Sequence, residues 1–407
     1  MKNVCMIAYT NYSTDARVQR EAETLVSDGN FNVHFITPYN DIEPKRYIKA
    51  GVEIIEFPCE KFTGKSLGKY LFSYLHFMLL CFIHCSRLWT KGRVDIVHVH
   101  NMPNFLVFAA IIPKIFGKKV VLDVHDTLIE TYSSKYEGFA QKMMLFLLFL
   151  EERISCWFAD RVICVNDIQR DILLKRGVPT EKILVLLNVP DPEIFKPLHK
   201  PTESIERKDF LVGYHGTIAR RLGIDIAIRS IVNLRKKSLG ISLLIIGDGD
   251  DRKDCERLVQ MLEAGSYIRI MDLIPVAELP RMLKDVDLGI VPNRENQATQ
   301  LMLPVKMLEC IALGMPVLVP RLKTIEHYFN KEMVYFFDPN EPESIEKSLE
   351  EIYHDPVGRE VKAMKAIEFL DEYGWQHQKK DLIRMYFSLS SSPSNIARED
   401  ISNCRIR

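Results

Sequence analysis

The chain has 407 residues, of which 47% are hydrophobic and 27% are charged, which is typical of a folded globular protein long enough for two domains. Its 54 basic and 54 acidic residues balance to a net charge of zero, so nothing global indicates nucleic-acid binding. The nine cysteines show neither a CxxC pair nor a Cys/His ligand spacing. We therefore expect reduced thiols, no zinc site and a cytoplasmic protein, because the N-terminus runs into a strand without a signal-peptide pattern.

The N-terminal half alternates β-branched runs with segments of helical length. The expected strands are residues 4–8, 33–37, 52–57, 95–99, 119–123, 161–165 and 183–187, and the helices include 15–27, 105–116 and 167–175. Apolar strands that alternate with helices predict a parallel sheet covered on both faces. After residue 188 the pattern gives way to prolines and charges, so we expect residues 191–209 to be a linker.

The apolar segment Tyr70–Trp89 has a borderline length for a membrane span and contains two histidines and an arginine. It lies between two strands expected in one sheet, so we expect a crossover helix that does not span a bilayer. Residues 61–122 hold nine basic residues against one acid, Asp95, and the helix is apolar nearly all round. These features suit docking on an anionic membrane surface, and burial between the sheet and a partner subunit is the alternative.

The loop and helix after the first strand carry Asn11 and Arg17 as candidate acceptor-side residues. Ser13, Thr14 or Asp15 can cap this helix, which would place Arg17 in its first turn. The region has no GxGxxG pattern, and the chain has no Walker lysine loop. A dehydrogenase or a P-loop enzyme therefore loses most of its support.

Two further strands of this half end in histidines. His125 follows Asp123 by two residues, so alternation puts both side chains on one side of the strand, where a histidine beside a carboxylate suits acid–base chemistry or substrate positioning. A purely structural histidine is the alternative. His98 and His100 are also two residues apart, but no third metal ligand is evident, so we expect no metal and interpret His100 and Asn101 as acceptor-side polar groups or structural ones.

The alternation restarts after the linker. The expected strands of this half are residues 210–214, 241–246, 267–271, 287–291 and 317–319. The fold class is therefore α/β, with two doubly wound, Rossmann-like domains at residues 1–190 and 210–370. Because open α/β sheets bind ligands at the carboxyl ends of their strands, we expect these ends to face one cleft. Residues 390–407 are polar and look like a disordered tail.

Two glycine-bearing turns follow strands of the second domain. Their candidate ligand-binding residues are Gly216, Thr217 and Arg220 or Arg221 in the first turn, and Gly247, Asp248 and Gly249 in the second. Glycines let the backbone approach a ligand, and an arginine can bind phosphate oxygens in a bidentate manner. Ordinary tight turns with solvated arginines are the alternative.

The stretch 301–316, LMLPVKMLECIALGMP, predicts an apolar helix that carries Lys306 and Glu309. Pro304 suits the first helical position, which leaves the N–H groups near Val305 and Lys306 free at the positive end of the helix. With Lys306, that end would bind a diphosphate, and Glu309 would accept hydrogen bonds from a ribose diol. The alternative is a surface salt bridge between residues three apart.

In order and spacing these stretches resemble the GT-B glycosyltransferases of family 4, from residue 1 to about residue 389. The matching stretches are TDARVQREAETL (14–25), DIVHVHN (95–101), VVLDVHD (120–126), ADRVICVN (159–166), NVPDPEIF (188–195), GYHGTIARRLGIDIAI (213–228), LLIIGDGD (243–250) and LPVKMLECIALGMPVLVPRLKTIEHYF (303–329). The resemblance implies transfer of a sugar, with retention, from a UDP- or GDP-sugar to a hydroxyl acceptor without a required metal or other cofactor. Residues 371–389 look like the family's last helix, which returns to the N-terminal domain.

By this match, Arg221 and Lys306 would hold the diphosphate, Glu309 the ribose and His125 the transferred sugar, with residues 247–249 near the nucleoside. Together with the basic, apolar region 61–122, the resemblance suggests a lipid-linked glycan acceptor, in polysaccharide or cell-envelope biosynthesis at the inner face of the plasma membrane.

One position departs from the family pattern. Many members have a first glutamate eight positions before the second, and here that position is Leu301. Thr299, Gln300 or Glu295 is a candidate substitute. The departure keeps two alternatives open: a nucleotide-sugar epimerase of the same fold, and a non-catalytic nucleotide-sugar-binding subunit.

Overall fold

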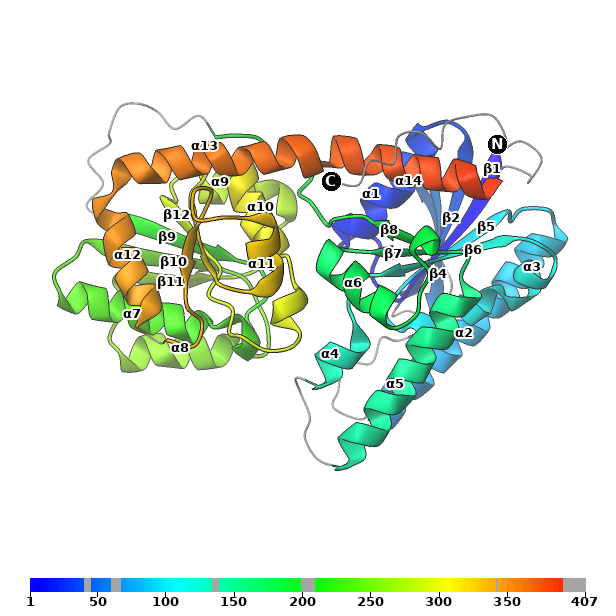
Figure 1. Ribbon diagram of the computed structural model, residues 1–407, viewed down its shortest axis with the longest axis horizontal. Coiled ribbons are helices and arrows are strands. Elements are labelled where there is room, and N and C mark those ends of the chain that lie inside the picture. Colours follow the sequence, from blue (N-terminus) through cyan, green and yellow to red (C-terminus); the bar gives the residue numbers. More distant parts are fainter. Residues whose placement is uncertain (40–44, 60–66, 134–138, 199–208, 342, 391–407) are drawn as a thin grey trace. The chain divides into compact units, whose positions relative to one another are not determined.

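A computed structural model of the chain (Figure 1) describes residues 1–39, 45–59, 67–133, 139–198, 209–341 and 343–390. The chain divides into two compact units: unit 1 is Met1–Leu186 with Gln378–Arg407, and unit 2 is Leu187–His377. Most of the expected linker and nearly all of the expected tail lie outside the described residues. The cleft that we expect between the units stays a prediction.

Unit 1 contains an eight-stranded sheet with the order β3-β4-β2-β1-β5-β6-β7-β8, in which all neighbours are parallel except β3 and β4. Its strands are β1 (Lys2–Ala8), β2 (Phe31–Tyr39), β3 (Lys45–Lys49), β4 (Val52–Pro58), β5 (Ile96–His100), β6 (Lys119–Val124), β7 (Arg161–Cys164) and β8 (Ile183–Val185). The seven predicted strands are confirmed. The sequence pattern missed β3, because this edge strand is exposed along its whole length and has no apolar alternation.

The helices of unit 1 place its polar residues. Its helices are α1 (Ala16–Ser27), α2 (Leu67–Thr90), η1 (Asn104–Ala110), α3 (Ile111–Ile115), α4 (Leu128–Ser133), α5 (Phe139–Phe158), α6 (Asp167–Lys175), η2 (Thr180–Lys182) and α14 (Trp375–Ser390), which starts in unit 2. Alternate residues of β5 and β6, such as Val97, Val99 and Leu122, join one core with α2, η1 and α5. The residues between them, His98, His100 and Asp123, therefore face the other side of the sheet, toward α1 and α14.

The helix predicted at 105–116 is wrong in type. The chain forms the 3₁₀ helix η1 and then the short α-helix α3. Pro113 lies inside this stretch, where it has no N–H for the carbonyl four residues earlier and its ring crowds that carbonyl. One continuous α-helix is therefore disfavoured.

The apolar helix α2 runs between β4 and β5, which belong to one sheet as predicted. Among the described residues, Gly68–Thr90 is the one helix that is long and apolar enough to cross a membrane by length and composition. Its inner face, with Phe77, Cys81 and Cys85, is part of the core of unit 1. The helix is therefore anchored to the sheet along one side (Figure 1).

Unit 2 contains a six-stranded parallel sheet with the order β11-β10-β9-β12-β13-β14. Its strands are β9 (Phe210–His215), β10 (Ile241–Ile246), β11 (Ile268–Met271), β12 (Leu288–Ile290), β13 (Val317–Pro320) and β14 (Tyr335–Phe337). Its helices are η3 (Arg220–Leu222), α7 (Ile224–Lys236), α8 (Arg252–Met261), η4 (Val276–Glu278), α9 (Leu279–Leu283), η5 (Thr299–Leu301), α10 (Val305–Ala312), α11 (Lys323–Tyr328), α12 (Ser344–His354) and α13 (Pro356–Tyr373). The five predicted strands are confirmed, and the three-residue β14 was missed. Both units are doubly wound α/β sheets, as predicted.

Candidate active site

The N-terminus of α10 lies directly after Pro304. The sequence predicts Pro304 as the first helical residue, and this is wrong by one position. The proline is the N-cap, because its ψ of 120° keeps it extended. Its carbonyl accepts hydrogen bonds from the N–H groups of Met307 (3.0 Å) and Leu308 (3.4 Å). The N–H groups of Val305 and Lys306 have no acceptor among the described residues. The positive end of the helix is therefore available to an anion, as predicted for these two residues.

Lys306 lies at this helix end without a carboxylate partner. Its Nζ is 4.1 Å from the centre of the Tyr214 ring and forms a hydrogen bond with the Tyr214 hydroxyl. No ion pair joins it to Glu309 in the described part of the chain, so the alternative of a salt bridge three residues apart does not form. Burial lowers the pKa of Lys306 to about 7, Glu309 opposes the shift and the charge of Arg221 adds to it. A bound anion would reverse this shift.

Glu309 faces the last residue of β9. One of its carboxylate oxygens lies 2.6 Å from Nε2 of His215, and its side chain stays 14% exposed. The other carboxylate oxygen has no partner among the described residues, which leaves it free for a hydroxyl group. We did not predict a role for His215, although its position at a strand end before Gly216 is a signal for one.

The two glycine-bearing turns pack backbone against backbone beside Lys306. A Cβ on Gly247 would lie 1.9 Å from the carbonyl oxygen of Gly216, and a Cβ on Gly216, where φ is +105°, would lie 3.4 Å from Nζ of Lys306. A Cβ on Gly249, where φ is +154°, would lie 2.2 Å from the carbonyl oxygen of Ile218. Glycine is therefore required at these positions, and the turns are closer to Lys306 than ordinary solvated loops would be.

The remaining predicted donor residues surround these turns. Thr217, Asp248 and Arg221 are exposed, and Arg221 lies in η3. The charge of Arg221 lowers the pKa of Lys306, which places the two cations near each other. The structure thus gathers the predicted donor residues of all three segments at the carboxyl end of the unit 2 sheet.

The three candidate substitutes for the glutamate that is absent at Leu301 bond to other residues. Thr299 is fully buried, and its hydroxyl donates to the carbonyl of Arg294 (2.6 Å). The Gln300 amide donates to Glu295 (2.8 Å) and accepts from the Lys323 N–H (2.6 Å). Thr299 is therefore committed to the turn, while Glu295 and Gln300 form an exposed pair.

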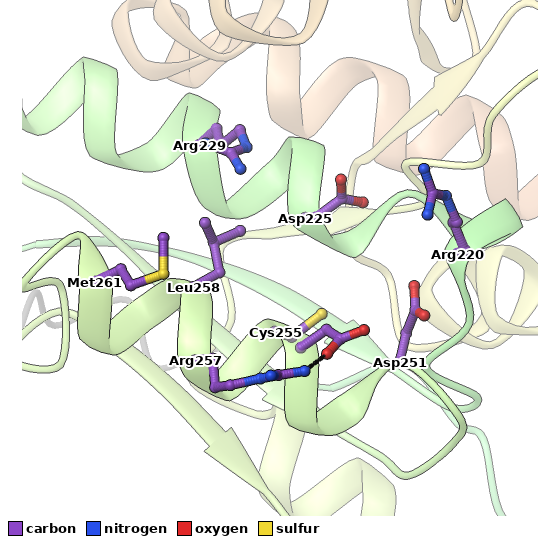
Figure 2. Close-up of a pocket in the computed structure, with 9 residues that line it drawn as sticks. Arg220, Asp225, Arg229, Asp251, Cys255, Arg257, Leu258 and Met261 are labelled. Carbon is purple, nitrogen blue, oxygen red and sulfur yellow. Dashed lines mark hydrogen bonds and ion pairs between the residues drawn. The ribbon is translucent and has the colours of Figure 1, made fainter.

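A cavity of about 370 Å³ lies elsewhere in unit 2, between α7 and α8 (Figure 2). Arg220, Asp225, Arg229, Asp251 and Cys255 are among its lining residues. Of the candidate ligand-binding residues named from the sequence, Arg220 lines this cavity, whereas Arg221, Lys306 and Glu309 do not. Its mixed charges give no clear preference for an anion.

In unit 1, Asp123 is the centre of a buried network. The Arg17 guanidinium donates to both of its oxygens, with Nη2 at 2.8 and 3.1 Å. Nε2 of His125 lies 2.8 Å from Oδ2 of Asp123, and Nδ1 of His100 lies 3.1 Å from the same oxygen. Arg17, His100 and His125, three of the candidate residues named from the sequence, therefore meet at one carboxylate.

These contacts set the ionisation of the network. Burial acts to raise the pKa of Asp123, but Arg17 and His125 outweigh it and hold this pKa well below its usual range. For His125 burial acts to lower the pKa, and Asp123 outweighs it, so the pKa of His125 is raised. The network therefore favours a carboxylate on Asp123 and an imidazolium on His125.

Asn101 fixes the backbone that carries His125. Its side-chain oxygen accepts from the His125 N–H (2.8 Å), and its amide donates to the carbonyl of Asp126 (2.8 Å) and to Oδ1 of Asn104 (3.0 Å). Asn11 instead forms a local turn, accepting from the N–H (2.9 Å) and the hydroxyl of Ser13 (2.7 Å). Asn101 is therefore part of the His125 site, whereas Asn11 shows no bond to it in the described residues.

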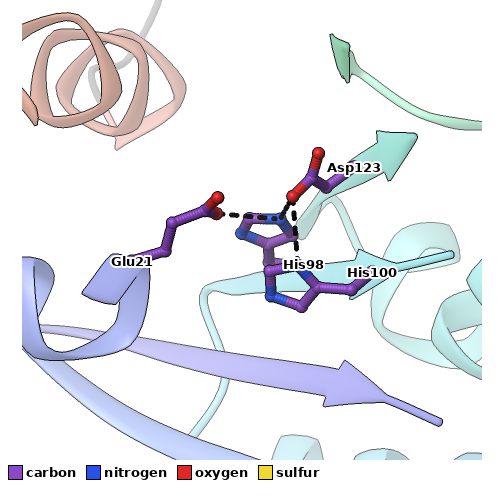
Figure 3. Close-up of side chains that lie close together, drawn as sticks. All are labelled: Glu21, His98, His100 and Asp123. Carbon is purple, nitrogen blue, oxygen red and sulfur yellow. Dashed lines mark hydrogen bonds and ion pairs between the residues drawn. The ribbon is translucent and has the colours of Figure 1, made fainter. Parts of the chain in front are cut away.

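A metal-like constellation lies behind His125. Ligand atoms of Glu21, His98, His100 and Asp123, all buried, lie within 4.8 Å of one another (Figure 3). The sequence reasoning missed Glu21 because it comes from α1, far from the histidines along the chain. Arg17 contacts both carboxylates, with Nε 3.1 Å from Glu21 and Nη2 2.8 Å from Asp123, so its guanidinium already supplies positive charge to this cluster.

His98 is held by the C-terminal helix. Its Nδ1 lies 2.6 Å from the hydroxyl of Tyr386 in α14, and both side chains are buried. Burial holds the pKa of His98 well below its usual range, so this histidine stays neutral. The sequence pattern gave no signal for Tyr386, which is 288 residues from its partner.

Solved structures with this architecture are glycosyltransferases. Sucrose-phosphate synthase from Thermosynechococcus elongatus matches with a TM-score of 0.76 at 15% identity, over 96% of this chain and 99% of that chain. HepE from Anabaena, in complex with UDP, matches with a TM-score of 0.68 at 12% identity, over 95% and 100% of the two chains. The catalytic domain of starch synthase IV from Arabidopsis thaliana, bound to ADP and acarbose, matches with a TM-score of 0.68 at 14% identity, over 96% and 100%. The fold is therefore that of the GT-B glycosyltransferases.

Comparison of sequences identifies the family. The model Glycosyltransferase Family 4 matches residues 16–194, and the model Glycosyl transferases group 1 matches residues 195–368. A D-inositol 3-phosphate glycosyltransferase from Corynebacterium urealyticum is 24% identical over 249 residues, which span 57% of this chain and 58% of that protein. The chain belongs to glycosyltransferase family 4, as its sequence motifs indicated.

Proposed function

We propose that this chain transfers a sugar, with retention of anomeric configuration, from a UDP- or GDP-sugar to a hydroxyl of a lipid-linked glycan. The observation that supports donor binding most strongly is Lys306, which has no carboxylate partner in the described parts of the chain, at the free N-terminus of α10. Glu309 lies one turn further along the helix, with one oxygen free for a ribose hydroxyl. UDP in the HepE structure and ADP in the starch synthase structure agree with a nucleoside diphosphate as the ligand of such a fold.

In the proposed reaction, unit 2 stabilises the leaving diphosphate. The N–H groups of Val305 and Lys306, the Lys306 ammonium and Arg221 supply positive charge where negative charge develops. The close turns at Gly216 and Gly247 let the backbone approach the phosphates without a side chain in the way. No general base is needed for this contribution.

His125 has the proposed role of binding a hydroxyl of the transferred sugar. Its Nε2 is engaged with Asp123, and its Nδ1 has no partner among the described residues. Because Asp123 favours the imidazolium, Nδ1 would donate a hydrogen bond and not accept one. Arg17 and Asn101 would hold Asp123 and the His125 backbone in place.

The lipid-linked acceptor rests on the composition of region 61–122 and on the exposed apolar face of α2. Such an acceptor would place the enzyme at the cytoplasmic face of a membrane, in polysaccharide or cell-envelope biosynthesis. Leu301 bears on the sugar transferred, because a contact that many family members supply through a glutamate is absent here.

Product analysis tests this function. The full chain would be incubated with UDP-glucose, UDP-N-acetylglucosamine or GDP-mannose and a bacterial lipid extract, and the products analysed by mass spectrometry and NMR. We expect a new glycoside with the anomeric configuration of the donor, lost in Lys306→Ala. An epimerised donor without a glycoside would instead identify an epimerase, and nucleotide binding without turnover would identify a non-catalytic binder.

A further inference from the structure

Large apolar side chains are exposed on three neighbouring helices of unit 1. They are Leu71, Phe72, Leu75, Leu79 and Ile83 of α2, Ile111, Ile115 and Phe116 in and after α3, and Met143, Phe146, Leu147, Leu150, Ile154 and Trp157 of α5. Phe72 is 73% exposed and Trp157 is 77% exposed. Single exposed apolar residues are ordinary, but this many on three helices of one unit indicate an interaction surface.

Packing joins these helices into one layer on the same side of the sheet. Tyr74 of α2 meets Phe105 of η1 edge to face, with ring centres 6.5 Å apart, and Phe158 of α5 meets Phe108 of η1 at 5.2 Å. Trp89 at the end of α2 stacks on Phe116 at 4.2 Å. The core and η1 therefore occupy the inner faces of α2 and α5, and the exposed side chains lie on the remaining faces of these helices.

The charges on this layer have one sign. The exposed charged side chains of the described parts of α2, α3 and α5 are Lys69, Arg87, Lys142 and Arg153. The two acids of α5 are turned inward, where Glu151 accepts from the Phe105 N–H (2.6 Å) and Glu152 pairs with Arg176 (2.8 Å). In the described part of this layer, the exposed charged side chains are therefore all basic.

We infer that the exposed faces of α2, α3 and α5 form a docking surface for an anionic lipid bilayer. Side chains such as Phe72, Phe146 and Trp157 enter the interfacial region, and the lysines and arginines bind lipid phosphates. A second copy of the chain fits this surface poorly, because it would bring basic residues against basic residues without counter-charges. This inference deepens the proposed function, on which the identity of the acceptor rests, and adds α5 to the region that the sequence indicated.

The docking surface is connected to the His125 loop through Glu151. The Glu151 carboxylate accepts from the side chain of Asn104 (2.9 Å), and Asn104 accepts from Asn101, which holds the His125 backbone. Three hydrogen bonds therefore connect α5, which would contact the bilayer, with the loop that carries His125. A lipid-linked glycan held in that bilayer would have its sugar end close to unit 1.

Co-flotation with vesicles tests the docking surface. The full chain would be mixed with vesicles of phosphatidylglycerol and phosphatidylcholine in equal parts, or of phosphatidylcholine alone, at low and at high salt. We expect flotation with the anionic vesicles, weakened by salt, and at least about tenfold weaker partition for Trp157→Glu and for Phe146→Glu. Met261→Glu is the matched control, because Met261 is 76% exposed in unit 2 and its change should leave partition unchanged.

Two results would overturn the inference. One is a wild-type chain that does not float with anionic vesicles at low salt. The other is a concentration-dependent dimer that Phe146→Glu dissociates, without vesicle binding, which would make a second copy the occupant. Calorimetric binding of UDP and GDP to Trp157→Glu shows whether this variant keeps its nucleotide site. Vesicle binding by the wild type without any sugar transfer would leave the docking surface standing and reject the proposed acceptor.

Discussion

The polar groups at the strand ends of the two units differ in how they are paired. In unit 1 the ionisable groups around Asp123 bond to one another, so that Arg17, His100 and His125 all share one carboxylate. In unit 2 Lys306 has no carboxylate partner, and the N–H groups of Val305 and Lys306 have no acceptor in the described residues. The difference indicates that unit 1 is preorganised by its own contacts, whereas unit 2 leaves its positive groups for a ligand.

The cause of this difference is where the residues come from. The unit 1 network is built from alternate positions of β5 and β6, from Arg17 of α1 and from His125 directly after β6. Arg17, His100 and Asp123 are buried and must satisfy one another, while the His125 side chain is 21% exposed. The unit 2 residues come from turns and from a helix N-terminus, where backbone groups stay accessible. Three substitutions and one pH series test this difference between the units.

Arg17→Met should destabilise unit 1 by about 3–5 kcal/mol, because it removes the guanidinium that contacts the buried carboxylates of both Asp123 and Glu21. Chemical denaturation followed by circular dichroism measures the loss. Arg170→Met is the control: Arg170 pairs with Asp167 and Asp171 at the surface, so its loss should cost no more than about 1 kcal/mol. Equal effects of the two changes would contradict a preorganised network.

UDP or GDP binding should weaken as the pH rises above 7. Burial sets the pKa of Lys306 at about 7 in the free protein, and a bound diphosphate raises it, so binding takes up a proton above pH 7. Between pH 7.5 and 9 the affinity should fall by up to about tenfold per pH unit. Calorimetry measures this slope, and Lys306→Arg should flatten it because arginine stays protonated. A slope that is unchanged in Lys306→Arg would remove Lys306 from the site.

Relative to the wild type, Glu151→Gln should raise the free energy of unfolding more at pH 8 than at pH 5. Burial raises the pKa of Glu151 in the folded protein to about 7. The contribution of this carboxyl group to the free energy of unfolding is therefore fully present below the ordinary carboxyl pKa and is lost as the pH rises through 7. The difference between the two pH values should be about 1–3 kcal/mol in the free energy of unfolding. Denaturation curves of both proteins at both pH values measure it, and a pH-independent difference would show that Glu151 titrates normally.

Tyr386→Phe should cost about 1 kcal/mol, because it removes the hydrogen bond to His98 and leaves the ring in place. Tyr267→Phe, at a half-buried tyrosine of unit 2, is the control and should shift stability by less than about 0.5 kcal/mol. The measurement is again chemical denaturation. No loss in Tyr386→Phe would mean that α14 is held by its apolar contacts alone.

Local pattern predicted most of the strands, the order of the elements, and the positions of His125 at a strand end and of Lys306 at a helix N-terminus. It missed β3, whose KRYIK sequence carries no apolar alternation, and the 3₁₀ form of η1 before Pro113. It also missed partners brought together only by the tertiary fold, because His215 and Glu309 are 94 residues apart and His98 and Tyr386 are 288 apart. Spacing along the chain carries no information about such pairs.

The central claim is that Lys306 and Glu309 form a nucleotide-binding site. Its most direct test is calorimetric binding of UDP and GDP to the wild type, to Glu309→Ala and to the exposed control Glu278→Ala. We expect one nucleotide to bind to the wild type, Glu309→Ala to lose at least about tenfold in affinity, roughly 1.4 kcal/mol, and Glu278→Ala to bind like the wild type. Absence of binding by a folded wild-type sample, or equal binding by all three proteins, would contradict it.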